Sequence, residues 1–247
     1  MKVKTKEIFS GHKFKYFDDQ IIGQCLNQDK LWEPALTDYI SKRFLYLTDK
    51  QTFIDIGAHV GYFSVLWASL ADNIHEPDYR ATIWAFEPKK ENFSILEENL
   101  IRFDCDYHSI KFFDCAIGIK ETEGTLICDK KNTGKNEVHT NINNVYLSKE
   151  QTIEPCYIKK ITSFDIDWDD VNLIKIDTEG GEDQIIKSMW DLLMPGTQII
   201  VEENYEVNKF IEKTKVYVPY FIRNRFILPD GTVSKDQYHI DYVLEKE

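Results

Sequence analysis

The stretch TFIDIGAHVGYFS, residues 52–64, decides the fold class of this chain of 247 residues. Its first half, TFIDI, is a run of β-branched and aromatic residues typical of a buried strand. Near the end of that run stands Asp55, and Gly57 and Gly61 follow before the helix-like YFSVLWASLA. Glycine lets the backbone turn sharply and lets a ligand press against it, since a Cβ would occupy that space. The stretch predicts a strand, a tight loop and a helix, with a ligand against the loop.

Strand-like and helix-like segments alternate from residue 51 to about residue 205. The strand-like ones are TFIDI, TIWAF, IKFFDCAIG, GTLICD, NLIKID and TQIIVEE, and the helix-like ones are YFSVLWASLA, KENFSILEENLIRF and EDQIIKSMWDLL. Short apolar strands separated by helices imply right-handed βαβ units and a parallel sheet covered on both faces. VYVPYF and HIDYVLE, joined by a turn at Pro229-Asp230-Gly231, are expected to close the sheet with at least one antiparallel pair.

Residues 1–50 precede this alternation and are expected to form an N-terminal extension of short strands and a helix. EIFSGHKFKYF is interpreted as short strands around a turn at SGH, and WEPALTDYISKRFLYL as a helix with Pro34 in its first turn. The chain is too short for two domains of typical size, each with its own core. We therefore expect one domain at residues 51–247 behind this extension.

The composition excludes several classes of protein. A formal net charge of −12 argues against a protein that grips phosphate backbones, so nucleic acid is not an expected partner. The five cysteines are scattered without zinc-ligand spacing, which predicts buried thiols in a reducing compartment. No window approaches the roughly 20 apolar residues of a membrane span, and the basic start lacks the apolar core of a signal peptide. A soluble, cytoplasmic protein is expected.

The glycine spacing in DIGAHVG matches neither the G-x-G-x-x-G of dinucleotide enzymes nor the lysine-bearing phosphate loop. An amino-acid or nucleoside ligand is therefore more plausible than a pyrophosphate. The next strand ends in AFEP, which places Glu87 beside the same crevice. A carboxylate at this position can accept hydrogen bonds from both hydroxyls of a ribose.

These segments, together with DCAIG and LIKIDTEGGEDQII, resemble the S-adenosylmethionine-dependent methyltransferases of the FkbM family over about residues 32–203, most specifically at IDTEGGE. The resemblance implies a Rossmann-like class I methyltransferase: an α/β fold whose mostly parallel, seven-stranded sheet has helices on both faces. It implies that the glycine loop lies under the methionine part of the cofactor, that Glu87 holds the ribose, and that DCA borders the adenine. The residues it assigns to S-adenosylmethionine are Asp55, Gly57, His59, Gly61, Tyr62, Phe63, Ser64, Glu87, Pro88, Asp114, Cys115 and Ala116. The family usually has Asn where this chain has His59, so a backbone contact is expected to survive there.

Methyl transfer to a hydroxyl needs an acceptor held in line and a group that takes the proton. Asp177, at the end of LIKID, is placed for that role, and Glu179 follows as the second candidate catalytic residue. Mutual repulsion of the acids in this stretch could raise one pKa toward neutrality. The alternative is that these acids cap the next helix, which is the interpretation preferred for Glu182.

A divalent cation is a second possibility at the same strand ends. Asp177, Glu203 and Asn204 would supply the oxygen ligands that Mg²⁺ prefers, an arrangement similar to that of the catechol O-methyltransferases. The FkbM resemblance does not itself imply a metal, and solvated acids at strand ends are the favoured interpretation. No metal is expected.

The sequence indicates an O-methyltransferase acting on a hydroxyl of a sugar, either nucleotide-linked or a surface-polysaccharide precursor, as the resemblance implies. A polyketide or other secondary-metabolite hydroxyl stays open as acceptor, as does a non-catalytic nucleoside-binding module. Residues 129–144, polar and without clear periodicity, are interpreted as a solvated loop or as a lid over the acceptor. A homo-oligomer is not excluded.

Overall fold

The computed structural model describes residues 1–9, 11–19, 21–45, 50–74, 79–103, 108–142, 145–227 and 233–247. Its centre is a seven-stranded sheet with the order β12-β13-β11-β10-β3-β4-β5. In that order the strands are Tyr217–Ile227, Val233–Glu245, Gln198–Glu202, Val171–Ile176, Lys50–Ile56, Arg80–Phe86 and His108–Phe113. The five strands from β11 to β5 are parallel, whereas β13 is antiparallel to both β11 and β12. The predicted α/β fold and antiparallel closing pair are confirmed, and the sheet is mixed.

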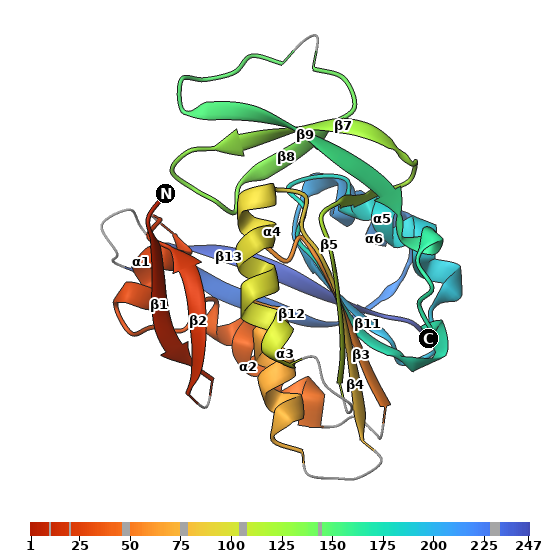
Figure 1. Ribbon diagram of the computed structural model, residues 1–247. Coiled ribbons are helices and arrows are strands. Elements are labelled where there is room, and N and C mark those ends of the chain that lie inside the picture. Colours follow the sequence, from red (N-terminus) through yellow and green to blue (C-terminus); the bar gives the residue numbers. More distant parts are fainter. Residues whose placement is uncertain are drawn as a thin grey trace.

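Helices cover both faces of this sheet (Figure 1). One face carries α2 (Pro34–Leu45), α3 (Tyr62–Asp72) and α4 (Lys90–Leu100), and the other carries α5 (Glu182–Met189) and α6 (Tyr205–Thr214). Short 3-10 turns are η1 (Ile101–Phe103), η2 (Ile161–Ser163), η3 (Trp168–Asp170) and η4 (Trp190–Leu192). Each face therefore has its own hydrophobic core.

The alternation of side chains along β3 supplies both cores. Phe53 stacks on Trp67 of α3 with ring centroids 5.0 Å apart, while Ile54 and Ile56 point to the opposite face. These side chains are at most 1% exposed, and burying each contributes about 1.5–3 kcal/mol. The run TFIDI is thus a strand buried on both faces, as its composition predicts.

The N-terminal extension packs into the first core and is not a separate body. It comprises β1 (Val3–Ile8), β2 (His12–Phe17) and α1 (Ile22–Asn27), followed by α2. β1 and β2 form the predicted hairpin, although Ser10 of its turn lies outside the described residues. Phe14, Leu36 and Ile40 are buried among residues of α3 and α4. The extension therefore helps to build the domain it precedes.

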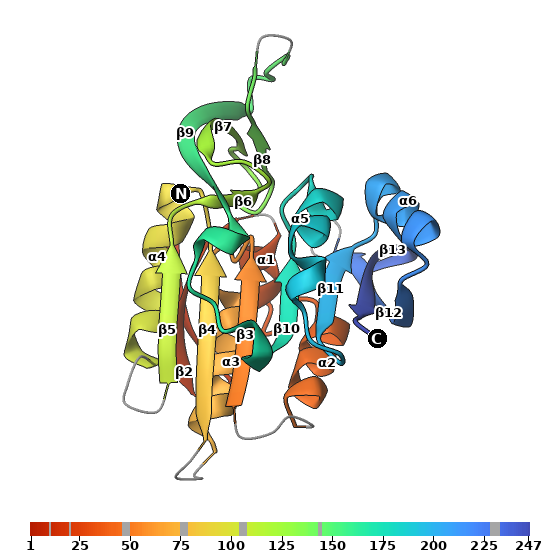
Figure 2. The ribbon, with the colours of Figure 1, turned by 90° about the vertical axis from the view of Figure 1, so that its right-hand side faces the viewer.

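A second sheet, which we call the roof sheet, has four strands in the order β6-β9-β7-β8. They are Ala116–Gly118, Gln151–Lys160, Thr122–Asp129 and Asn136–His139. The expectation that IKFFDCAIG is one strand and that GTLICD continues the main sheet is wrong, because the chain turns after Phe113 and Ala116 pairs with Ile158 of β9 instead. Figure 2 shows the roof sheet above the carboxyl ends of β3, β4 and β5.

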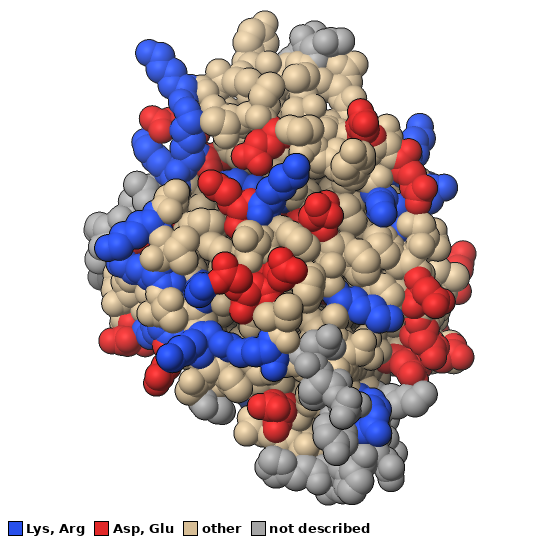
Figure 3. Space-filling model, in the orientation of Figure 1, with Lys and Arg blue, Asp and Glu red and all other residues tan. Residues whose placement is uncertain are grey.

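Other expectations have mixed outcomes. The turn at 229–231 and Cys105 lie outside the described residues, whereas the cysteines at 25, 115, 128 and 156 are buried free thiols, as predicted. Among the described helices, none is long and apolar enough to cross a membrane. On the face shown in Figure 3, the described lysines and arginines lie among aspartates and glutamates and form no continuous band.

Candidate functional site

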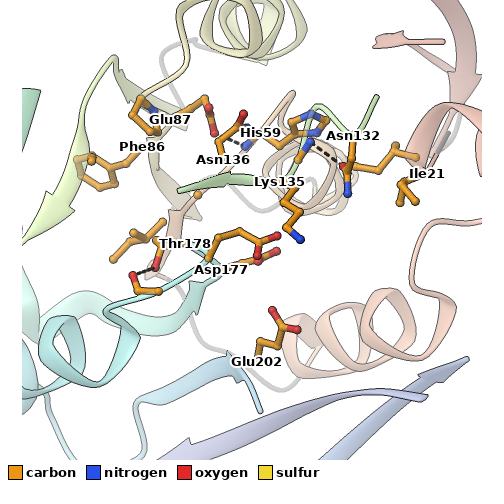
Figure 4. Close-up of a pocket in the computed structure, with 18 of the residues that line it drawn as sticks. Ile21, His59, Phe86, Glu87, Asn132, Lys135, Asn136, Asp177, Thr178 and Glu202 are labelled. Carbon is orange, nitrogen blue, oxygen red and sulfur yellow. Dashed lines mark hydrogen bonds between the residues drawn. The ribbon is translucent and has the colours of Figure 1, made fainter. Parts of the chain in front are cut away.

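A cavity of about 430 Å³ lies at the carboxyl ends of the parallel strands, below the roof sheet. Residues at or just after the carboxyl ends of β3, β4, β5, β10 and β11 form its walls, together with residues from the N-terminal extension and from the β12–β13 pair. The turn between β7 and β8 covers it. Figure 4 shows Lys135 from this turn, with Asp177 and Glu202 from the strand ends, pointing into the space.

The two glycines of the first loop serve the packing of the protein itself. Gly57 and Gly61 have φ values of +80° and +85°. A Cβ on Gly57 would lie 1.8 Å from the carbonyl oxygen of Asp177, and one on Gly61 would lie 2.6 Å from Leu96 Cδ1. Gly57 still lines the cavity through its backbone, whereas Gly61 begins α3 and faces α4. The expectation that a ligand fills the place of a side chain at Gly61 is therefore wrong.

His59 lies between these glycines and also has a left-handed backbone, with φ of +52°. Asparagine tolerates this conformation better than most residues, so the Asn that the resemblance implies at this place would fit the same backbone. The His59 N–H donates to Glu87 Oε2 at 3.0 Å, and its ring Nε2 is 2.8 Å from Thr133 Oγ1. Burial lowers the pKa of His59 to about 4, so the ring is neutral at physiological pH.

Four residues that the resemblance assigned to the cofactor lie behind the cavity wall: Asp55, Tyr62, Phe63 and Ser64. Asp55 Oδ2 accepts a hydrogen bond of 2.7 Å from the Ser64 hydroxyl, and burial raises the pKa of Asp55. The Tyr62 hydroxyl accepts from the Trp32 N–H at 3.2 Å. These side chains therefore support the wall from behind, and none of the four lines the cavity.

Glu87 is the buried acid of the cavity, with 4% of its surface exposed. Its Oε1 accepts from the Lys89 N–H at 3.0 Å and from Asn92 Nδ2 at 3.2 Å, and Oε2 accepts from His59. Burial raises the pKa of Glu87 to about 7 despite these donors. Each carboxylate oxygen has about two lone-pair sites, so Oε2 keeps room for a ligand hydroxyl.

The wall beside Glu87 is largely apolar. Pro88, Cys115 and Ala116 line the cavity, as the resemblance implied, and Phe86 and Ile117 extend this surface. Asp114 is exposed and does not line the cavity, so the expectation that its carboxylate meets an adenine amino group has no support in its position. A flat aromatic ligand fits such an apolar wall better than a charged one.

An ion pair between a buried lysine and a partly exposed aspartate lies at the other end of the cavity. Lys175 Nζ donates to Asp177 Oδ2 at 2.9 Å, with the lysine side chain 4% exposed and the aspartate side chain 42% exposed. Burial alone would raise the pKa of Asp177, but the Lys175 ammonium outweighs it and holds that pKa below its usual value. Asp177 is therefore ionised, and it is not the acid whose pKa moves toward neutrality.

The acid whose pKa moves toward neutrality is Glu179. Partial burial of its carboxyl group, together with the negative charges of Asp177 and Glu202, raises the pKa of Glu179 to about 7. Glu179 lines the cavity with Asp177 and has a left-handed backbone, with φ of +57°. The predicted pairing of two acids with different pKa values is present, and Glu179 is the one that can take up a proton near neutral pH.

The other acids of this region are engaged within the protein. Glu182 Oε1 accepts from the Gly180 N–H at 2.7 Å, a bond to the turn before α5 and not to an N–H of the helix itself. Asn204 Oδ1 caps α6 by accepting from the Val207 N–H at 2.9 Å, and Asn204 Nδ2 donates to Glu182. Glu203 accepts from the Tyr242 hydroxyl at 2.7 Å. The side chains of Glu203 and Asn204 thus do not join Asp177, and no cluster of three metal-ligating side chains occurs within the described ranges.

Sequence reasoning missed a polar cluster from distant parts of the chain. His239 Nδ1 lies 3.2 Å from Glu202, and its Nε2 lies 3.3 Å from Asp241 and 3.8 Å from Glu33. Burial raises the pKa of Glu33 to about 8, helped by the charge of Asp241. Asn224 adds a buried amide to the same side of the cavity. The pairing of β12 with β13 brings Asn224 opposite His239, a proximity that no local motif signals.

The predicted lid segment is in part a strand and in part a cover. β8 begins at Asn136, and Asn132, Gly134, Lys135 and Asn136 line the cavity. We call residues 132–136 the roof turn. Asn143 and Asn144, at the end of the predicted segment, lie outside the described residues.

Comparisons with solved structures give fold relatives. TYW2 from P. horikoshii, solved in complex with MeSAdo, has a TM-score of 0.50 and 13% identity, over 98% of this chain and 70% of that one. The FkbM methyltransferase from Methylobacillus flagellatus KT has a TM-score of 0.48 and 15% identity, over 80% of this chain but 45% of that one. The precorrin-6y C5,15-methyltransferase from Geobacter metallireducens GS-15 has a TM-score of 0.45 and 13% identity, over 86% and 88%. No curated protein matches this sequence.

The identities are so low that such likenesses show the fold alone. A family model gives a more specific result. The model described as "Methyltransferase FkbM domain" matches residues 55–246, from the acid of the glycine loop to the end of β13. The match thus includes the glycine loop, Glu87, the ion pair of Lys175 and Asp177, and the β12–β13 pair. This chain therefore belongs to the FkbM methyltransferase domain family.

Proposed function

We propose that this chain transfers a methyl group from S-adenosylmethionine to a hydroxyl of a sugar, either nucleotide-linked or part of a surface-polysaccharide precursor. The observation that carries the proposal is the buried carboxylate of Glu87 in the cavity wall, between the glycine loop and the apolar surface of Pro88, Cys115 and Ala116. A nucleoside needs these two surfaces, one for ribose hydroxyls and one for a base. MeSAdo bound to the fold relative TYW2 supports a nucleoside ligand.

The residues present fit this cofactor. Glu87 Oε2 accepts from the His59 N–H and, with about two lone-pair sites, can accept a ribose hydroxyl as well. Gly57 and His59 would face the amino-acid part, and the ionised Asp177 and the carboxyl of Glu179 would face the reacting end. S-adenosylmethionine supplies, when bound, a methyl group on a positively charged sulfur, and carboxylates at this end of the cavity favour positive charge.

Two carboxyl groups have different roles at the acceptor. Asp177 is fixed by Lys175 and stays ionised, so it can accept a hydrogen bond from a hydroxyl and orient it. Glu179, with its pKa raised to about 7, is suited to take the hydroxyl proton. We assign Asp177 to orientation and Glu179 to proton acceptance.

A sugar is supported by the polar groups around the remaining space. The roof turn presents Asn132, Lys135 and Asn136, and the opposite wall presents Glu202 and Asn224. Amide, ammonium and carboxylate groups together can meet hydroxyls both as donors and as acceptors. A secondary-metabolite hydroxyl would need fewer such groups, and a non-catalytic nucleoside-binding module would need none of them.

The test is methyl transfer from S-adenosylmethionine carrying a radiolabelled methyl group, against nucleotide-linked sugars, free sugars and aromatic hydroxyl compounds. The proposal expects labelled product with a sugar and a loss of it with Glu179→Gln, while S-adenosylhomocysteine still binds to that variant. Glu212→Gln on the outer part of α6 is a matched control with the same chemical change. Transfer to aromatic hydroxyl compounds alone would show that the acceptor is not a sugar but an aromatic hydroxyl. Binding without transfer to any acceptor would favour the non-catalytic module.

A further inference from the structure

Thr133, in the roof turn, is linked to both oxygens of the Glu87 carboxylate. On one side Asn92 Nδ2 donates to Glu87 Oε1 at 3.2 Å and to the Thr133 carbonyl at 3.0 Å. On the other side the His59 N–H donates to Glu87 Oε2 at 3.0 Å, and the His59 ring contacts Thr133 Oγ1 at 2.8 Å. The four residues form a closed ring of hydrogen bonds between the ribose carboxylate and the roof turn.

The direction of each bond in this ring is fixed. The Thr133 hydroxyl has one hydrogen, and it donates this to Asp19 Oδ2 at 2.5 Å. Thr133 Oγ1 can therefore only accept from His59, so the proton of the neutral ring is on Nε2. Asp19 Oδ1 in turn accepts from the Gly23 N–H at 2.7 Å, at the start of α1. Thr133 thus ties the roof turn to the N-terminal extension and to the glycine loop with one hydroxyl group.

Thr133 is also the inner anchor of the roof turn. Thr133 is 2% exposed, whereas Gly134 and Lys135 beside it are exposed and line the cavity. Its carbonyl accepts a second bond from Asn136 Nδ2 at 2.6 Å, which fixes the start of β8. Without the Thr133 hydroxyl, the turn keeps its carbonyl contacts but loses its links to His59 and Asp19.

We propose that Thr133 is a positioning residue that couples Glu87 to the roof turn, so that a nucleoside on Glu87 and closure of the turn over the acceptor space stabilise each other. The inference rests on the proposed function, because it takes Glu87 as the ribose ligand. A ribose bound to Glu87 restricts the motion of the Glu87 carboxylate. The ring of hydrogen bonds then restricts the motion of residues 132–136 as well. By linkage the effect is reciprocal, so a closed turn also strengthens nucleoside binding. The cofactor then binds before the acceptor, since the bound cofactor orders the roof turn and with it Lys135 and Asn136.

The experiment uses S-adenosylhomocysteine as the probe and compares wild type with Thr133→Val, which keeps the shape and the carbonyl but lacks the hydroxyl. Thr133→Ser restores the hydroxyl and serves as the rescue. Thr122→Val is the matched control, because Thr122 is exposed and its hydroxyl donates to the neighbouring Glu123 carbonyl at 3.2 Å. Calorimetry measures Kd, and hydrogen exchange measures protection of the amides at 130–139.

The expected result is a Kd about five- to tenfold higher in Thr133→Val, as for couplings at the lower end of the usual range, with wild-type values in Thr133→Ser and Thr122→Val. In wild type the probe should slow exchange at 130–139 by about tenfold, and this protection should be lost in Thr133→Val. An unchanged Kd in Thr133→Val overturns the inference. If that variant does not fold, the wild-type exchange decides, because unchanged exchange with the probe bound overturns the inference as well. A wild-type protein that binds no probe refutes the proposed function itself.

Discussion

The pH dependence of nucleoside binding is the sharpest consequence of the environment of Glu87. In the free protein, burial raises the pKa of Glu87 to about 7. Ribose hydroxyls donate hydrogen bonds, so they bind the ionised carboxylate, and binding must release the proton that the free protein holds below that pH. The affinity should therefore rise as pH increases toward 7 and level off above it.

The size of this effect follows from the fraction of ionised Glu87. For a pKa of about 7, this fraction is about one tenth at pH 6 and about nine tenths at pH 8, so Kd should fall about tenfold between them, or about 1.4 kcal/mol. The ligand for this test is adenosine, because it lacks the sulfur and methyl group that would face Asp177 and Glu179, and Glu179 also titrates near pH 7. Calorimetry in two buffers with different ionisation enthalpies gives both Kd and the number of protons released.

Glu87→Gln provides the control, since it keeps the shape and cannot ionise. Its Kd should be independent of pH, and its Tm should be lower because the amide group faces the N–H donors of His59 and Lys89. An equal Kd at pH 6 and pH 8 in the wild-type protein, with no proton released, would refute the assignment of the ribose to Glu87.

Three further outcomes test other parts of the account. Glu179→Gln should lower turnover by about 10²–10⁴ while the Kd of S-adenosylhomocysteine stays the same. Asp177→Asn should lower turnover and also Tm, because it removes the negative charge that pairs with the buried Lys175. Equal turnover in both variants and in the wild type would mean that the chemistry lies elsewhere. Gly61→Ala should reduce stability by about 1–3 kcal/mol in chemical denaturation, because its Cβ would meet Leu96, and a folded variant should bind S-adenosylhomocysteine normally; weakened binding at full stability would return Gly61 to the cofactor site. Turnover should survive a chelator, because Asn204 and Glu203 are already engaged with Val207 and Tyr242; loss with EDTA and recovery with Mg²⁺ would contradict this.

The glycine loop was predictable because its signals are local. A β-branched strand, an acid and two glycines in thirteen residues are enough to predict the strand, the turn and the helix, and the strand-end Glu87 is found in the same way. The role of Gly61 was not predictable, because the atom that excludes its Cβ belongs to Leu96 on another helix. The glycine spacing indicated that a side chain would not fit there, but only the fold shows that Leu96 fills the space.

The acceptor side of the cavity depends on contacts between distant segments. Glu33 and His239 meet at the cavity although they come from opposite ends of the chain. The roof sheet was missed because strand-like segments do not show which sheet they join. In contrast, α6 had a local signal, namely Asn204 as N-cap followed by buried Val207 and Phe210, which the sequence interpretation overlooked.

The central claim is that the cavity below the roof sheet holds S-adenosylmethionine with its ribose on Glu87 and its reacting end toward Asp177 and Glu179. The most direct measurement is a crystal structure of the protein with S-adenosylhomocysteine. The account predicts ribose hydroxyls within hydrogen-bond distance of Glu87, the base against Cys115 and Ala116, and the sulfur on the side of the cavity that carries Asp177 and Glu179. A nucleoside bound at any other place, or bound here with its ribose away from Glu87, would contradict it.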